Sequence, residues 1–302
     1  MMKITKKISL QKLKEIALSL LFFASTNAIA ASCLDVFPTV LSSSEKKGKV
    51  EIEREVDVNG TNGSLDIEIN KDETTSINPS CITQKCIGSN KRAEAFSLPR
   101  FQTSSSTINS EVNNGDTLSL PQGSYKNIKV EYQATLRFTQ NNEASFIKNL
   151  SVDSETTVIF EEGVYWIETF TIGYRTNIII EGNEKVTLII ENRPKNSDKY
   201  SLEFDQSEVS FNAGGTTDQL VLIAYEDVNF GYKANFKGFI YADKNVELKN
   251  ENVFEGAING DSIKLKYQAA ITYAPDSIES ANFNGFCTAS ANLPAALAGY
   301  QF

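Results

Sequence analysis

Histidine is missing from all 302 residues of this chain. Without it, Ser-His-Asp and Cys-His catalysis are excluded, and the commonest general base near neutral pH is lost. Arginine is scarce after residue 117, where it occurs only at Arg137, Arg175 and Arg193. The sequence contains neither a phosphate-binding loop nor a dinucleotide-binding fingerprint. We therefore expect a protein with no enzymatic activity, no cofactor and no metal site.

Long apolar runs are missing outside the N-terminus, and a membrane-spanning helix needs about 20 apolar residues, so we expect no transmembrane span. Residues 3–14 contain five lysines, residues 16–24 are mostly apolar, and Ala28-Ile29-Ala30 is a small-x-small cleavage signal. This order is typical of a secretory signal peptide and predicts cleavage after Ala30. Ala30-Ala31-Ser32 before Cys33 also loosely resembles a lipobox, so lipidation of Cys33 is the alternative.

Positive charge is in short supply once the signal peptide is removed. Residues 1–30 carry five Lys and one Glu, which leaves 24 basic and 37 acidic residues and a net charge of −13. A nucleic acid or an anionic membrane would bind a basic surface, so the charge argues against both as partners. We expect an exported protein that lies in the periplasm, on the outer-membrane surface or outside the cell.

The four cysteines predict two disulfides, because export places the chain in an oxidising compartment. Four cysteines allow three pairings. Cys81 and Cys86 enclose only four residues and form the natural local ring, which leaves Cys33 to pair with Cys287 near the other end of the chain. A thioredoxin-like site would have two residues between its cysteines, and a zinc site would lack histidine ligands.

Residues 31–117 form an irregular N-terminal segment. Residues 50–53 and 65–69 alternate apolar and polar side chains, and Asn59-Gly60 and Asn62-Gly63 lie between them. This pattern predicts a β-hairpin. The remainder, up to residue 117, is rich in Ser, Thr and Asn and is interpreted as a capping segment.

Self-similar segments dominate the chain after residue 118. Val228-x-Phe230, Val246-x-Leu248 and Ile263-x-Leu265 recur at nearly equal intervals. Residues 129–138 match residues 264–273 in residue type along their whole length. A repeat this short cannot bury its own apolar face, and stacking of successive coils solves that problem.

The predicted fold is therefore all-β, a right-handed single-stranded β-helix over residues 118–275 with about eight coils. Arg193 to Lys199 are expected to leave one corner as a loop, and residues 276–302 to form a C-terminal cap and tail. A β-sandwich is the competing fold, but its strands would not keep so regular a spacing.

Two sets of residues could carry a function. Asp227, Asp243 and Asp261 precede predicted strands and could bring carboxylates together at one corner, although Asp is also common in turns for its own backbone hydrogen bonds. The other set could form a row of rings for sugar binding, although a stabilising ladder with several rings on the buried face is the favoured interpretation. This set consists of Tyr132, Tyr174, Tyr232, Tyr267 and Trp166.

Several segments resemble the N-terminal part of the MSHA (mannose-sensitive haemagglutinin) pilus biogenesis protein Q family of Gram-negative bacteria. The similar segments are Cys33-Leu-Asp-Val-Phe37-Pro38, Cys81-x4-Cys86, Ser97-Leu-Pro99-Arg-Phe101-Gln102-Thr103-Ser104, Gly163-Val-Tyr165-Trp166-Ile167-Glu168, Gly238-Phe-Ile-Tyr241-Ala242, Gly256-Ala257-Ile258 and Phe283-Asn-Gly285-Phe286-Cys287. Their order and spacing, over residues 33–287, carry the resemblance. It implies a role in a type IV pilus system used for attachment, with no cofactor or catalytic residue. Family members continue into a long C-terminal region.

The sequence thus predicts an exported, non-enzymatic structural or surface protein linked to type IV (MSHA-like) pilus biogenesis or adhesion. Its expected partners are pilus or envelope proteins, or a surface glycan. The alternative is a polysaccharide-active or carbohydrate-binding β-helix protein.

Overall fold

A computed structural model describes most of the chain between residues 31 and 287. The described residues are 31–38, 40–42, 49–53, 56–59, 64–67, 85–88, 93, 96, 98, 100–140, 144–191, 202–204, 208–283 and 286–287. The predicted signal peptide, residues 81–84 of the predicted disulfide ring, the loop at 193–199 and the tail beyond 287 lie outside them. Among the described helices, none is long and apolar enough to cross a membrane.

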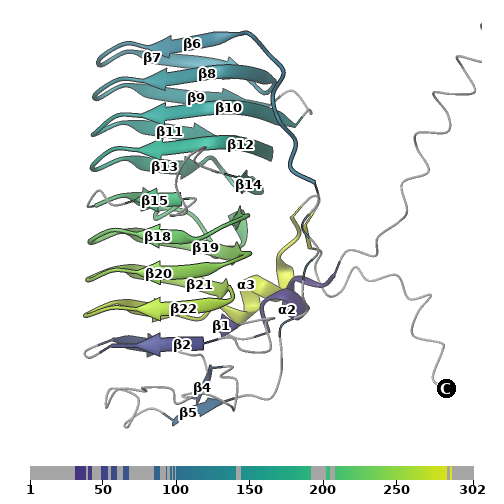
Figure 1. The fold of residues 1–302 in the computed structure, drawn as a ribbon, viewed down its shortest axis with the longest axis vertical. Coiled ribbons are helices and arrows are strands. Elements are labelled where there is room, and N and C mark those ends of the chain that lie inside the picture. Colours follow the sequence, from purple (N-terminus) through teal and green to yellow (C-terminus); the bar gives the residue numbers. More distant parts are fainter. Residues whose placement is uncertain are drawn as a thin grey trace, which may run out of the picture. The chain divides into compact units, whose positions relative to one another are not determined.

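The fold is a β-solenoid in which parallel strands stack into about seven turns (Figure 1). In chain order the solenoid strands are β6 (Asn109–Val112), β7 (Thr117–Pro121), β8 (Ser124–Val130), β9 (Thr135–Thr139), β10 (Ser145–Val152), β11 (Thr157–Phe160), β12 (Gly163–Ile172), β13 (Asn177–Ile180), β14 (Val186–Ile190), β15 (Leu202–Phe204), β16 (Ser210–Phe211), β17 (Leu220–Ala224), β18 (Val228–Phe230), β19 (Asn235–Ala242), β20 (Asn245–Leu248), β21 (Val253–Asn259), β22 (Ser262–Leu265) and β23 (Ala270–Thr272).

Strand register confirms the repeat seen in the sequence. Val228 pairs with Val246, and Val246 pairs with Ile263, so the recurring segments lie directly beside one another in successive coils. Other coils are longer, because Val130 pairs with Val152, and Ile178 pairs with Phe211 across the loop that follows β14. Longer coils explain why the solenoid has fewer turns than a constant short period predicts.

The interior of the solenoid is filled by stacked apolar side chains. In strands such as β11 and β22, every second residue points inward and is buried. Aromatic rings lie above one another in successive coils. Phe138 and Phe160 are 5.2 Å apart between centroids, and Phe236 and Phe254 are also 5.2 Å apart with nearly parallel rings. Each coil therefore depends on its neighbours for burial.

The N-terminal segment extends the C-terminal end of the solenoid. Its strands are β1 (Leu41–Ser42), β2 (Lys49–Ile52), β3 (Asp57–Asn59), β4 (Ser64–Ile67) and β5 (Lys85–Gly88). In the described pairings β2 lies parallel to β22, β3 parallel to β23, and β4 parallel to β1 and β5. The predicted hairpin is therefore wrong: alternating side chains suit a parallel solenoid strand as well as a hairpin strand.

From β5 the chain returns to the opposite end before it starts the main run of coils. Residues 100–108 pass along the outside of the solenoid, as the blue segment before β6 shows in Figure 1. Phe101 contacts Trp166 and Tyr225 on the way, with ring centroids 5.5 Å apart in each case. The solenoid then begins at Asn109, upstream of the boundary expected from the sequence.

One outer face of the solenoid is apolar, and terminal segments cover it. All five residues of β14 and of β17 are buried, because these strands have apolar neighbours on both sides. The outward side chains of this lateral face pack against α2 (Cys33–Val36), α3 (Pro275–Ser280) and the residues Phe283, Phe286 and Cys287. We call α2, α3 and these three residues the terminal cover. The outward side chains are Ile189, Val221, Ile223, Phe239, Tyr241 and Ala257.

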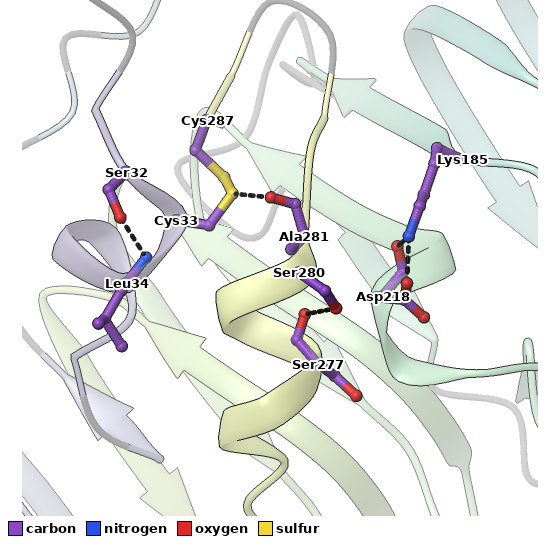
Figure 2. Close-up of a disulfide and its surroundings, with 9 residues drawn as sticks. All are labelled: Ser32, Cys33, Leu34, Lys185, Asp218, Ser277, Ser280, Ala281 and Cys287. Carbon is purple, nitrogen blue, oxygen red and sulfur yellow. Dashed lines mark hydrogen bonds and ion pairs between the residues drawn. A yellow bond between two sulfur atoms is a disulfide. The ribbon is translucent and has the colours of Figure 1, made fainter. Parts of the chain in front are cut away.

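A disulfide between Cys33 and Cys287 ties the two ends of the terminal cover together, as predicted (Figure 2). The two Cα atoms are 4.9 Å apart, and the sulfur of Cys33 lies 3.4 Å from the carbonyl oxygen of Ala281. Because this sulfur is bonded to Cys287, it cannot also carry the lipid that the alternative interpretation of Cys33 requires.

Gly256 lies where two adjacent coils approach each other closely, and substitution there tests this contact. Its φ is +142°, and a Cβ atom there would overlap the carbonyl oxygen of Gly238 in the preceding coil. We expect Gly256→Ala to lower the free energy of unfolding by about 3 kcal/mol or more in urea denaturation. Gly214→Ala, where a Cβ meets nothing within 4 Å, is the control and should change it by no more than about 0.5 kcal/mol.

The disulfide should stabilise the fold by restricting the unfolded chain. The two cysteines are separated by 254 positions in the sequence, and for a loop of this length the chain-entropy model gives roughly 5 kcal/mol. We expect the double variant Cys33→Ser/Cys287→Ser to unfold at a lower urea concentration and to lose hydrogen-exchange protection first in α3. Ser280→Ala on the exposed side of α3 should leave both unchanged. Equal midpoints for the double variant and the parent would contradict the role of the bond.

Candidate functional site

The three aspartates predicted as catalytic candidates do share one corner of the solenoid. Asp227 lies in the turn between β17 and β18, Asp243 between β19 and β20, and Asp261 between β21 and β22. Backbone hydrogen bonds join these turns, since the N–H of Asp261 donates to the carbonyl oxygen of Lys244 at 2.7 Å. Stacking of successive coils therefore brings them together, as their spacing predicts.

The contacts of these carboxylates are those of turn residues. Asp227 accepts hydrogen bonds from the backbone and side-chain nitrogens of Asn245, at 3.0 and 2.8 Å. Asp243 has the ammonium group of Lys244 at 4.0 Å. Within the described ranges, no three acidic or cysteine side chains gather closely enough to hold a metal ion. The arrangement offers hydrogen-bond acceptors that fasten one coil to the next.

A hollow of about 210 Å³ lies beside this corner, on the outer face of β18, β20 and β22. Its polar lining includes Asp227, Asn229, Glu247 and Lys264. Glu247 is paired with Lys266 at 2.5 Å, and Lys264 lies 3.6 Å from Glu51. The side-chain oxygen of Asn229 is buried and has no hydrogen-bond partner. Glu247 and Lys264 are thus each paired with an opposite charge from outside the lining of the hollow.

A second corner carries the four predicted tyrosines. Tyr132, Tyr174, Tyr232 and Tyr267 occupy the turns that follow β8, β12, β18 and β22, and these turns form one row at the left of Figure 1. Each tyrosine precedes a residue with positive φ. The equivalent positions predicted from the sequence are therefore confirmed, and we call this row of turns the tyrosine corner.

Backbone hydrogen bonds hold the turns of the tyrosine corner in register. The N–H of Glu155 donates to the carbonyl oxygen of Tyr174 at 2.7 Å, and the N–H of Glu208 donates to that of Tyr232 at 2.9 Å. The N–H of Glu251 likewise donates to the carbonyl oxygen of Tyr267 at 3.0 Å. The donor in each case is the residue with positive φ, so this conformation aims its N–H along the axis toward the next coil.

The tyrosine rings point outward. Tyr132 is 39 % exposed and Tyr232 is 49 % exposed, while Tyr174 and Tyr267 are half-buried. The interpretation that placed several of these rings on the buried face is therefore wrong. The turn, and not the alternation of the flanking strands, sets the direction of each side chain.

Side chains at the positive-φ positions alternate in charge along the tyrosine corner, a feature not predicted from the sequence. Glu208 accepts a 2.7 Å hydrogen bond from Arg175, and Lys233 lies 3.7 Å from Glu251. The residues are Gln133, Glu155, Arg175, Glu208, Lys233, Glu251 and Gln268. Four of them could have been found from the sequence, because Gln133, Arg175, Lys233 and Gln268 each follow a tyrosine directly. The three glutamates follow a serine or an asparagine and lack this signal.

Hydrogen bonds at the corner shift the pKa values of its side chains. Gln133 donates to Glu155 at 3.0 Å and Tyr132 donates to it at 2.9 Å, which lowers the pKa of the Glu155 carboxyl group. The bond between Tyr132 and Glu155 also raises the pKa of Tyr132. The hydrogen bond from Arg175 lowers the pKa of Glu208. These carboxylates stay ionised and act as acceptors that fix the side chains between coils.

Trp166 does not belong to the row of tyrosines. It lies in β12 and is half-buried against Phe101, within the apolar cluster of the lateral face. The side chain of Trp166 points toward the lateral face and not toward the tyrosine corner. Its inclusion in a single glycan-binding row is therefore wrong, because the two groups lie on different parts of the coil.

A scan against known protein families, a search of curated proteins and a search of solved structures each found no match.

Substitution of the aspartates at this corner tests whether they stabilise the turns. Asp227→Ala removes the acceptor of two hydrogen bonds from Asn245, so we expect the free energy of unfolding to fall by about 1–2 kcal/mol in urea denaturation. Asp243→Ala loses the long 4.0 Å contact with Lys244 and should cost less than about 0.5 kcal/mol. Equal effects of the two substitutions would argue against this assignment.

Proposed function

We propose that this protein is an exported, non-enzymatic structural or surface component that serves type IV (MSHA-like) pilus biogenesis or adhesion. It acts by presenting a rigid solenoid surface to a pilus or envelope partner. Residues 1–30 supply the export signal, and the Cys33–Cys287 disulfide fits an oxidising compartment outside the cytoplasm.

The observation that carries the proposal is the way the terminal cover is fastened. Both terminal segments pack on the lateral face, and the disulfide joins them. An apolar surface of this kind would otherwise promote association. With the surface covered, the solenoid presents mainly polar turns and strand faces, and local opening at its terminal segments is resisted. These are useful properties for a scaffold outside the cell.

The link to a pilus system rests on the resemblance of residues 33–287. The structure is compatible with it, because the similar segments at Cys33 and at Phe283–Cys287 meet in the terminal cover. These segments would keep their order and spacing among similar proteins because they pack together as one unit. Gly238 and Gly256, in two other such segments, lie opposite each other in β19 and β21.

A non-enzymatic role is supported by the contacts of the acidic residues. Asp227 and Asp243 have turn contacts, and Glu247 and Lys264 in the neighbouring hollow have partners of opposite charge. General acid–base catalysis would need a group available for proton transfer at a substrate. The polysaccharide-active alternative would have to use these same residues.

A gene deletion with matched complementation tests the proposal. We expect the deletion strain to lose surface attachment or pilus assembly, with a tagged copy recovered in the envelope or outside the cell. The triple variant Asp227→Ala/Asp243→Ala/Asp261→Ala should restore the phenotype, because these residues have no catalytic role. Cys33→Ser/Cys287→Ser should restore it less well, because the terminal cover is no longer fastened.

Two results would contradict the proposal. Normal attachment and piliation in the deletion strain would remove the assigned role. A polysaccharide-degrading activity in the purified protein, lost in a triple variant that remains folded by circular dichroism, would favour an enzyme instead.

A further inference from the structure

Tyrosine occurs in every second turn of the tyrosine corner. Between Tyr132 and Tyr174 lies the turn with Ser154, and between Tyr232 and Tyr267 lies the turn with Asn250. The backbone N–H of Gln133 donates to the carbonyl oxygen of Ser154, and that of Lys233 donates to the carbonyl oxygen of Asn250. The turns with Ser154 and Asn250 are therefore the direct neighbours of the tyrosine turns. Large rings and small polar side chains therefore alternate coil by coil, and the surface has a period of two coils.

The stacking of coils sets the distance between the rings. Adjacent parallel strands lie about 4.8 Å apart, so tyrosines in alternate coils are spaced by about 10 Å along the axis. Four such positions extend over about 29 Å. A surface with this period matches a linear ligand whose own repeat has the same length, and it cannot match one compact molecule at all four positions.

The charges of the corner favour an uncharged ligand. Arg175 is bonded to Glu208, and Lys233 faces Glu251, so each cation has an anion in a neighbouring coil. Glu155 is held by Gln133 and Tyr132. A polyanion would need unpaired cations, and a polycation would need unpaired carboxylates. The paired side chains still offer hydrogen-bond donors and acceptors, which is what hydroxyl groups require.

We propose that the tyrosine corner binds a neutral linear polysaccharide whose disaccharide repeat spans two coils. The C–H face of every second sugar ring packs on a tyrosine ring, and the intervening sugar lies over the small side chain of the next coil. The polar side chains of the corner bond its hydroxyl groups. This inference rests on the proposed surface role and names the class of ligand for it.

The four positions contribute unequally. Tyr132 and Tyr232 are the more exposed rings and provide most of the contact area. The guanidinium of Arg175 lies over the ring of Tyr174, 4.7 Å from its centroid, so this position offers less ring face. Tyr267 is half-buried. The terminal cover leaves the corner accessible, because α2 and α3 lie away from this row of turns in Figure 1.

Binding to defined oligosaccharides tests the assignment. The purified mature protein is titrated calorimetrically with β-1,4-linked glucose and N-acetylglucosamine oligosaccharides from tetramer to octamer, and with alginate as a polyanion. We expect one of the neutral series to bind, with affinity that rises in steps of two sugars. Tyr132→Ala and Tyr232→Ala should each lower affinity by about 2- to 10-fold, and Tyr174→Ala by less.

Matched variants separate ring contact from general damage to the corner. Ser154→Ala and Asn250→Ala change the turns that lack a tyrosine and should leave affinity within about twofold, the smallest loss expected for a ring. Tyr232→Phe should retain most of the binding, because the ring remains. Raising NaCl to about 0.5 M should not weaken binding, because the ligand carries no charge.

Three outcomes would overturn the inference: no binding to either neutral series, binding that the tyrosine variants leave unchanged, or preference for alginate that is lost in salt. The proposed function is judged separately. If the Tyr132→Ala/Tyr232→Ala variant fully restores attachment in the deletion strain, the polysaccharide assignment fails and the surface role stands. If deletion has no phenotype but oligosaccharides bind through the tyrosines, the surface role fails and the binding site stands.

Discussion

Hydrogen bonding between parallel backbones of neighbouring coils is the interaction on which this molecule depends. A single short coil has too few apolar side chains to bury them alone. Stacking places Val228 on Val246 and Val246 on Ile263, and the same register carries the aromatic pairs of the interior. The positions of functional side chains follow from the stacking as well. A residue type repeated once per coil becomes a row, and a type repeated in alternate coils becomes a row with twice the spacing.

Much of this arrangement is visible in the sequence, because stacked coils require similar residues at equal intervals. The short repeat that begins at Val228 holds in the structure, and so does the pairing of Cys33 with Cys287. The three aspartates also lie at one corner, as their spacing predicts. Side chains in turns were harder to predict, because the positive φ of residues such as Lys233 redirects the neighbouring tyrosine outward.

Long-range arrangement was the part that local patterns could not reveal. The apolar and polar alternation of residues 50–53 describes a strand with one buried face but does not say which strand lies beside it. Its neighbour β22 comes from the far end of the solenoid sequence. The sequence does carry a signal for the lateral face. Leu220–Ala224 is a continuous apolar run, and Val186–Ile190 is apolar except for Thr187, so neither strand alternates apolar and polar residues. Such runs indicate strands buried on both sides, and therefore a covering layer.

The place of the N-terminal strands has a consequence for the order in which the molecule can assemble. The coils from β6 to β23 can add one to the next, since each needs only its predecessor. Strands β2 and β3 precede these coils in the chain, but they pair with β22 and β23, the last two strands of the run. β2 and β3 must therefore wait for these partners while the intervening coils form. The pairing then joins segments that are separated by most of the chain. Such distant contacts slow folding and lengthen the interval during which a sheet edge is open to other chains. The stack of coils can thus be completed only after β22 and β23 have been synthesised.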